Sequence, residues 1–238
     1  MKGELKCVRS GTGRPIVLIP GLQGDPDIFS GLYKVLSPGR PLWAFRLGSG
    51  GLLDDAATLN ERLSDNGLKG LDVVAGSYGG HVALKSGGSF HSIVLTASFP
   101  KYEALPVQSR AVLKLSLRMP SVVLHRLYSL RFESRLKNDG VPSEISALLK
   151  CPSGTEVMAR LRSLENLIVE EAHVPILWVA GHEDSGSPWP ARVLQETWPG
   201  VSVQRISGKH RPYASHPGVF AARVENWWDE LQSSASKI

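Results

Sequence analysis

The chain has 238 residues, of which 42% are hydrophobic and 21% are charged. This length suits one well-buried core and is short for two complete domains, and the composition is close to that of a soluble globular protein. No apolar run approaches the ~20 residues that span a bilayer, so we expect no membrane span.

The N-terminus and the cysteines bear on location. The first ten residues mix charged and polar side chains without an apolar stretch, so we expect no secretory signal. Cys7 and Cys151 cannot form a multi-bridge framework and are interpreted as free thiols in a reducing compartment. These features favour a cytoplasmic location.

Short apolar, β-branched runs alternate with helix-length amphipathic segments in the first and last thirds of the chain. The predicted strands are 16–19, 42–45, 71–75, 93–97, 176–180 and 201–203. The predicted helices are about 26–35, 54–63, 79–87, 188–197 and 217–232. Nearly continuous apolar strands indicate burial on both faces, as in a parallel sheet covered by helices. The sequence therefore predicts an α/β fold with a doubly wound, mostly parallel sheet.

This alternation stops between Pro100 and His173, where apolar residues recur at helical spacing and prolines interrupt the pattern. We expect several short helices inserted between two strands. Residues 1–100 and 174–238 would then form the core, and residues 101–173 a helical lid.

The predicted lid is basic. From residue 101 to residue 163 it has eleven Lys and Arg side chains against five acidic ones. Such a surplus can attract an anionic partner, although a solvated basic helix face is the simpler interpretation. No nucleic-acid-binding motif accompanies it, so no nucleic-acid partner is expected.

Small residues surround a serine where the strand 71–75 meets a helix. The sequence there is Ala75-Gly76-Ser77-Tyr78-Gly79, which is typical of a nucleophile elbow. Such a turn strains the serine backbone and needs small residues two positions before and after it. The alternative is a phosphate-binding turn, but the Walker Lys-Ser/Thr ending and the three-glycine dinucleotide spacing are missing. Ser77 is therefore the candidate nucleophile.

Polar residues also follow the last two predicted strands. Asp184 comes after the strand 176–180, and His210 after the strand that begins at Val201. Ligands of doubly wound sheets bind beyond the carboxyl ends of the strands, and the chain order Ser, Asp, His is the one expected for this architecture. A serine hydroxyl needs an adjacent base, and the base needs a carboxylate that fixes its tautomer. We predict that Ser77 attacks, His210 transfers the proton and Asp184 orients His210.

The glycine-rich loop after the first predicted strand can approach the nucleophile closely. It reads Pro20-Gly21-Leu22-Gln23-Gly24. Attack on a carbonyl needs hydrogen-bond donors for the developing oxyanion. We expect the backbone N–H groups of Leu22 and Tyr78 to supply them.

Other residues could take these roles. Glu183 is the main alternative to the predicted acid, and His182 to the predicted base. His216 precedes a proline at a helix start and is interpreted as a capping or packing residue. No cluster of His, Cys and Asp has metal-ligand spacing, so neither a metal nor a cofactor is expected.

Together these motifs resemble the α/β-hydrolase superfamily. The resemblance extends over residues 16–228 and includes the loop 20–24, the serine turn, Gly-x-x-Asp at 181–184, Gly-x-His at 208–210 and the His-Pro pair at 216–217. One departure is Pro20-Gly21, where many members have His-Gly. The resemblance implies a Ser-His-Asp hydrolase with its lid inserted after the strand that follows the elbow.

The resemblance leaves the substrate open. Relatives include carboxylesterases, thioesterases, lipases and lyases, and we expect hydrolysis of a small-molecule carboxylic ester through an acyl-enzyme. The substrate-binding candidates are Gln23 and three lid residues that could line an acyl pocket, Leu117, Leu124 and Leu127. The main alternative is a thioesterase whose basic lid holds coenzyme A or an acyl carrier protein. A non-catalytic binding protein is a third hypothesis, which a complete Ser, Asp and His set disfavours.

Overall fold

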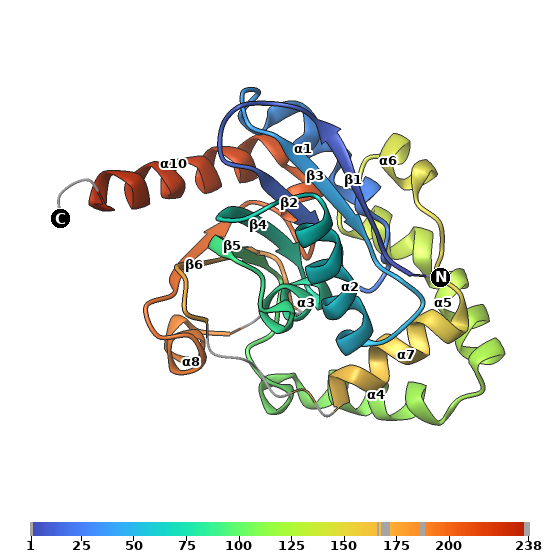
Figure 1. Cartoon of the computed structure of the whole chain (residues 1–238). Helices are drawn as coiled ribbons and strands as arrows, with labels where there is room; N and C mark the ends of the chain where they lie inside the picture. The colour runs from blue at the N-terminus through green and yellow to red at the C-terminus, as the bar shows by residue number, and fades with distance from the viewer. Residues whose placement is uncertain (1, 166, 168–171, 186–188, 236–238) are drawn as a thin grey trace.

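The computed structural model describes residues 2–165, 167, 172–185 and 189–235. In this part of the chain, seven strands form a single sheet (Figure 1). The strands are β1 (Glu4–Arg9), β2 (Ile16–Ile19), β3 (Leu42–Arg46), β4 (Leu71–Gly76), β5 (Phe90–Thr96), β6 (Ile176–Gly181) and β7 (Ser202–Ile206). Their order in the sheet is β1-β3-β2-β4-β5-β6-β7, with β1 antiparallel to β3 and the other neighbours parallel.

Helical segments follow most of the strands, and η marks a 3-10 helix. They are η1 (Pro26–Phe29), α1 (Ser30–Val35), α2 (Leu52–Asp65), α3 (Tyr78–Ser86), η2 (Tyr102–Ala104), α4 (Val107–Arg118), α5 (Ser121–Asn138), α6 (Ser143–Leu148), α7 (Gly154–Glu165), α8 (Ala191–Thr197), α9 (Pro212–Ser215) and α10 (Pro217–Ala235).

Helices cover both faces of the sheet, because successive side chains of a strand point to opposite sides. On β2, Val17 packs in a buried cluster with residues of α2, α3 and α8. Its neighbour Ile16 packs in a second cluster with residues of α1 and α10. The doubly wound, mostly parallel sheet predicted from the apolar runs is therefore confirmed.

The strand β1 is an addition to the predicted elements. Its charged residues Glu4 and Lys6 are exposed, which an antiparallel strand at the edge of a sheet tolerates. The remaining boundaries differ from the predicted ones by a few residues. The helix expected from Pro188 begins at Ala191, and Pro188 lies outside the described residues.

The segment between β5 and β6 contains the inserted helices, a term used here for α4 to α7. Leu124, Val157 and Met158 form a small buried cluster within them. The inserted helices also join both main clusters, through Leu113 of α4 on one face and Ile145 of α6 on the other. The inserted helices are therefore packed onto the two main clusters and do not form an independent domain core.

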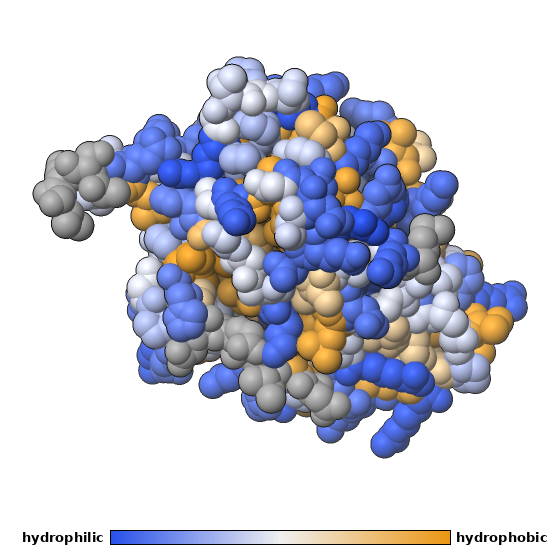
Figure 2. All heavy atoms as spheres, viewed as in Figure 1, coloured by the Kyte–Doolittle hydropathy of each residue, from blue (hydrophilic) through white to orange (hydrophobic). Residues whose placement is uncertain are grey.

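Exposed aliphatic side chains gather on the inserted helices. They include Val107 and Leu115 of α4, Val122 and Leu130 of α5 and Leu148 of α6. Figure 2 shows hydrophobic patches among largely hydrophilic atoms in this region, at the lower right of the view. None of the helices in the described part of the chain has the length and apolar character needed to cross a membrane.

Candidate active site

Ser77 stands at the sharp turn between β4 and α3 with a strained backbone. Its φ is 50° and its ψ is −114°, a conformation that residues other than glycine rarely adopt. The end of β5 holds it there: the Ser77 N–H donates to the Thr96 carbonyl (2.7 Å), and the Ser98 hydroxyl donates to the Ser77 carbonyl (2.9 Å). A side chain at Gly79 would collide with the carbonyls of Ile19 and Pro20. The turn is thus the one that the small residues predict.

The loops after β6 and β7 bring Asp184 and His210 together. These strands are neighbours in the sheet, and a side chain at Gly181 would collide with the carbonyl of Gly208, so the two loops pack backbone to backbone. The Nδ1 of His210 lies 3.2 Å and 3.1 Å from the two carboxylate oxygens of Asp184. Asp184 is buried, with 6% of its surface exposed. Because Nδ1 faces the carboxylate, Nε2 on the other side of the ring is left to face a reactant.

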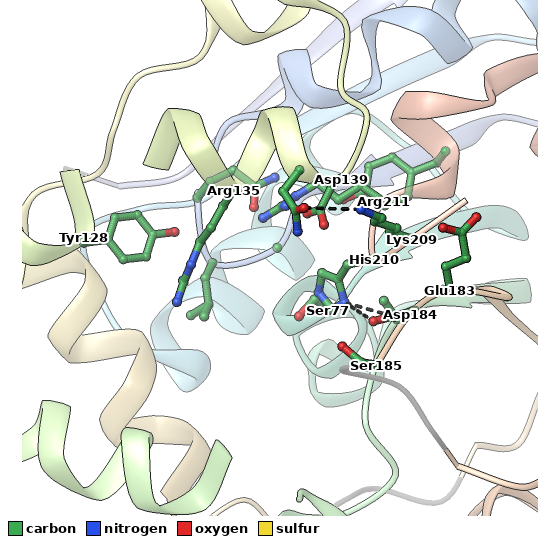
Figure 3. Close-up of a pocket in the computed structure, with 16 residues that line it drawn as sticks. Ser77, Tyr128, Arg135, Asp139, Glu183, Asp184, Ser185, Lys209, His210 and Arg211 are labelled. Carbon is green, nitrogen blue, oxygen red and sulfur yellow. Dashed lines mark hydrogen bonds and ion pairs between the residues drawn. The ribbon is translucent and has the colours of Figure 1, made fainter. Parts of the chain in front are cut away.

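Ser77 and His210 line the same cavity, which has a volume of about 660 Å³. Figure 3 shows the His210 ring beside Ser77, with Asp184 on its far side. Further walls come from the loop after β2, from α5 and from the segment before α9. The three residues predicted to act together therefore lie at one cavity, and their catalytic roles stay predictions.

The loop after β2 approaches Ser77 closely. A side-chain carbon at Gly21 would lie only 3.3 Å from the Cβ of Ser77. The Gly21 carbonyl accepts a hydrogen bond from the Gly24 N–H (2.9 Å). Because the peptide bond is trans, the Leu22 N–H points the opposite way. Leu22 lines the cavity.

The second predicted donor belongs to Tyr78, the first residue of α3. The first N–H groups of a helix have no intrahelical acceptor. Both expected N–H groups therefore belong to segments that adjoin Ser77, and their function as oxyanion donors stays a prediction.

Beneath this loop lies a buried polar network that the sequence analysis missed. Arg160 of α7 is 1% exposed and donates to the carbonyls of Leu22 (2.6 Å) and Gly48 (2.7 Å). Asp55 of α2 accepts hydrogen bonds from the Gly48 N–H (2.8 Å) and the Tyr78 hydroxyl (3.1 Å). Burial raises the pKa of Asp55 to about 6, although the Gly48 N–H and Arg160 oppose the rise.

A signal for Arg160 exists in the sequence. On α7 the buried residues Val157 and Leu164 recur at helical spacing, and Arg160 falls on the same stripe. A lone arginine in an apolar stripe indicates a buried partner, a signal that the count of basic residues in the predicted lid does not use.

The predicted substrate-binding residues have different outcomes. Gln23 lines the cavity and is 5% exposed, and its Nε2 has no hydrogen-bond partner among the described residues. The three leucines do not line the cavity. Leu124 is buried against Val157 and Met158, Leu117 packs against the same cluster, and Leu127 is 42% exposed. The helical spacing of Leu117 and Leu124 reflects packing among the inserted helices, whereas Leu127 lies on their exposed side.

The alternative candidates for the acid and the base are placed less favourably than Asp184 and His210. His182 is exposed and does not line the cavity. Glu183 lines it, but the His210 ring pairs with Asp184. His216 is exposed, and its Nδ1 lies 2.9 Å from the Ser215 hydroxyl. Within the described ranges, no group of three His, Cys, Asp or Glu side chains could hold a metal ion.

Comparisons with known proteins place the fold. No family model matches the chain, and no curated protein sequence matches it. Solved structures do match. An esterase from Exiguobacterium antarcticum is 15% identical, with a TM-score of 0.71 and 94% of each chain covered.

Two further matches have other activities in their names. The enol-lactonase from Burkholderia xenovorans LB400 is 12% identical, with a TM-score of 0.73, covering 95% of this chain and 96% of the lactonase. A bromoperoxidase from Bacillus anthracis is 15% identical, with a TM-score of 0.71, covering 95% of this chain and 94% of the bromoperoxidase. The chain therefore has the α/β-hydrolase fold.

Proposed function

We propose that this chain, built on the α/β-hydrolase fold, is a serine hydrolase that cleaves small-molecule carboxylic esters through an acyl-enzyme on Ser77. The observation that carries the proposal is the pairing of His210 Nδ1 with the buried Asp184 carboxylate at a cavity that Ser77 also lines. A serine is a weak nucleophile until such a base removes its proton.

The reaction proceeds in two stages. His210 Nε2 takes the proton from the Ser77 hydroxyl as its oxygen attacks the ester carbonyl, and the Leu22 and Tyr78 N–H groups stabilise the oxyanion. The tetrahedral intermediate collapses, its C–O bond breaks and His210 gives the proton to the departing alcohol. Water, deprotonated by His210, then attacks the acyl-enzyme, and the carboxylic acid leaves as Ser77 regains its proton. Asp184 stabilises the charged imidazole throughout.

The names of the structural neighbours agree with ester chemistry, since a lactone is a cyclic ester. The bromoperoxidase shows that the same fold is associated with other activities, so the fold alone does not select the reaction. The free thiols of Cys7 and Cys151 support a reducing compartment such as the cytoplasm.

Residues 101–173 are proposed to act as a lid over the core formed by residues 1–100 and 174–238. Support comes from α5, which contributes Tyr128, Arg135 and Asn138 to the cavity wall.

A second candidate is thioester hydrolysis with coenzyme A or an acyl carrier protein as the acyl donor. The helices α4 and α5 favour it, because together they carry seven Lys and Arg residues and one acidic residue. Replacing the exposed Arg126 and Arg131 with Glu should then slow turnover of carrier-bound substrates about tenfold more than that of 4-nitrophenyl butyrate. Equal effects on both substrates would remove this candidate.

The decisive experiment for the main proposal is labelling with a fluorophosphonate probe. The native chain should be labelled, and Ser77→Ala should abolish labelling and lower hydrolysis of 4-nitrophenyl butyrate by about 10⁶-fold. Ser185→Ala, at another serine of the same cavity, is the control and should retain labelling. Labelling that survives Ser77→Ala, or a loss of activity of less than about tenfold, would refute the proposal.

A further inference from the structure

One side of α5 presents two hydrogen-bond donors to the cavity. Tyr128 and Arg135 are seven residues apart, which is close to two helical turns, so their side chains leave the helix in similar directions. Both line the cavity that contains Ser77. In Figure 3 the Arg135 side chain extends from α5 between Tyr128 and the pair formed by Ser77 and His210.

The charge of Arg135 is not neutralised by the protein, whereas most charged groups around it are engaged. The engaged pairs are Asp139 with Arg211, Asp184 with His210, and Lys209 with the side-chain oxygen of Asn138. Arg135 makes no side-chain hydrogen bond or ion pair with any residue that the structure describes. Glu183 is the remaining carboxylate of the cavity, and Figure 3 shows it on the other side of Ser77 and His210 from Arg135.

The Tyr128 hydroxyl adds a neutral donor beside this cation. Burial raises its pKa above the ordinary value, although the nearby charges of Arg211 and Arg135 oppose the rise. The hydroxyl therefore keeps its proton at neutral pH. Within the described residues it has no acceptor, so both groups are available to a ligand.

The two donors disfavour a purely aliphatic acyl chain at this end of the cavity. Such a chain would displace water from the guanidinium without replacing its hydrogen bonds, which is costly. A carboxylate or phosphate would accept hydrogen bonds from both groups, and charge-assisted bonds of this kind are the stronger ones. Arginine also suits these anions geometrically, because its planar fork matches their paired oxygens.

We infer that the substrate carries an anionic group, a carboxylate or a phosphate, which Arg135 and Tyr128 bind while Ser77 attacks the ester. This inference rests on the proposed hydrolytic function and defines the class of ester. The anion belongs either to the acyl part or to the leaving group, and the two arms of the test separate these sources.

The test compares substrates whose carboxylate is either free or masked as its methyl ester. In the acyl arm, mono-4-nitrophenyl adipate is paired with its neutral methyl ester. In the leaving-group arm, 4-(hexanoyloxy)benzoate is paired with its neutral methyl ester. The native chain should favour the anionic member in one arm by about tenfold in kcat/KM, since hydrogen bonds to charged groups are strong and solvent weakens them at an exposed arginine.

Variants then test whether Arg135 and Tyr128 cause the preference for the anionic substrate. Arg135→Gln should bring the ratio of the two kcat/KM values close to one, and Tyr128→Phe should lower it by about threefold. Arg162→Gln removes an exposed arginine from a neighbouring inserted helix and should leave the ratio at its native value. Added salt should lower the native ratio, because screening acts on the charged substrate alone.

Two results would overturn the inference. One is a native ratio near one in both arms, and the other is a ratio that survives Arg135→Gln. Suppose that one of these results is found while the fluorophosphonate probe labels Ser77 and the neutral esters are cleaved. The hydrolytic function then stands, and the anionic substrate class is wrong. If the probe does not label the chain, the hydrolytic function itself fails.

Discussion

The guanidinium of Arg160 donates a hydrogen bond of 2.6 Å to the carbonyl of Leu22, although 138 residues separate the two in the chain. The same group fixes the carbonyl of Gly48 at 2.7 Å. It also lies where a side chain at Gly24, whose φ is +76°, would have to be. A residue of the inserted helices thereby orients the loop that carries the proposed oxyanion donor.

Replacing Arg160 should therefore impair the chemical step. We expect Arg160→Met to lower kcat for 4-nitrophenyl butyrate by about 10- to 100-fold with a smaller change in KM, because a mobile loop holds its N–H less well against the oxyanion. Arg160→Lys, which can still reach one carbonyl, should recover part of the loss. Arg162→Met, at an exposed position of the same helix, should behave like the native chain. An unchanged kcat in Arg160→Met would show that the loop needs no such anchor.

A second prediction concerns the neighbouring carboxylates of Asp184 and Glu183, and steady-state kinetics would test it. Asp184→Asn should lower kcat by about 10⁴-fold, because the amide favours the wrong imidazole tautomer and does not stabilise its charged form. Glu183→Gln is the matched control one residue away and should cost less than about tenfold, since Glu183 is exposed and His210 pairs with Asp184. The reverse order of effects would transfer the acid role to Glu183.

A third prediction concerns the acid stability of the fold. His81 of α3 is 2% exposed and packs on Phe99, with 4.5 Å between the ring centroids. Burial lowers its pKa from 6.5 to about 3. Between these values the unfolded chain binds a proton that the native one does not. The free energy of unfolding should therefore fall as the pH falls through this window, by up to about 1.4 kcal/mol per pH unit from this group.

Urea denaturation at pH 4, 5, 6 and 7 checks this prediction. His81→Leu should flatten the dependence relative to the native chain, whereas His173→Leu, at an exposed histidine, should keep it. Parallel curves for the native chain and His81→Leu would mean that the histidine is protonated in the folded state.

The sequence predicted the elements whose side chains have a single environment. The apolar runs of β2, β4 and β6 are buried throughout, so their hydrophobicity alone identifies them. The small residues around Ser77 predicted the sharp turn after β4. The polar residues after β6 and β7 could be expected near Ser77 because the carboxyl ends of parallel strands meet at one edge of the sheet.

Elements with mixed surroundings were harder to predict. The strand β1 has charges on an exposed edge and lacks an apolar run. Arginines have no periodic signature of their own, so Arg135 in the cavity wall could not be distinguished from a solvated one, whereas Arg160 is marked by the apolar stripe that it shares with Val157 and Leu164. Leu117 and Leu124 illustrate the converse, since helical spacing specifies a packed face without telling what covers it.

The position of Arg160 limits how far the chain can be shortened. A truncated chain that joins β5 directly to β6 would keep Ser77, Asp184 and His210, yet it would leave the Leu22 carbonyl without its donor and Asp55 without a neighbouring cation. Excision would thus remove the anchor of the loop that follows β2 along with the helices themselves. In the proposed assignment of Arg135 and Tyr128, point changes on α5 would alter substrate preference and leave the Arg160 anchor on α7 in place.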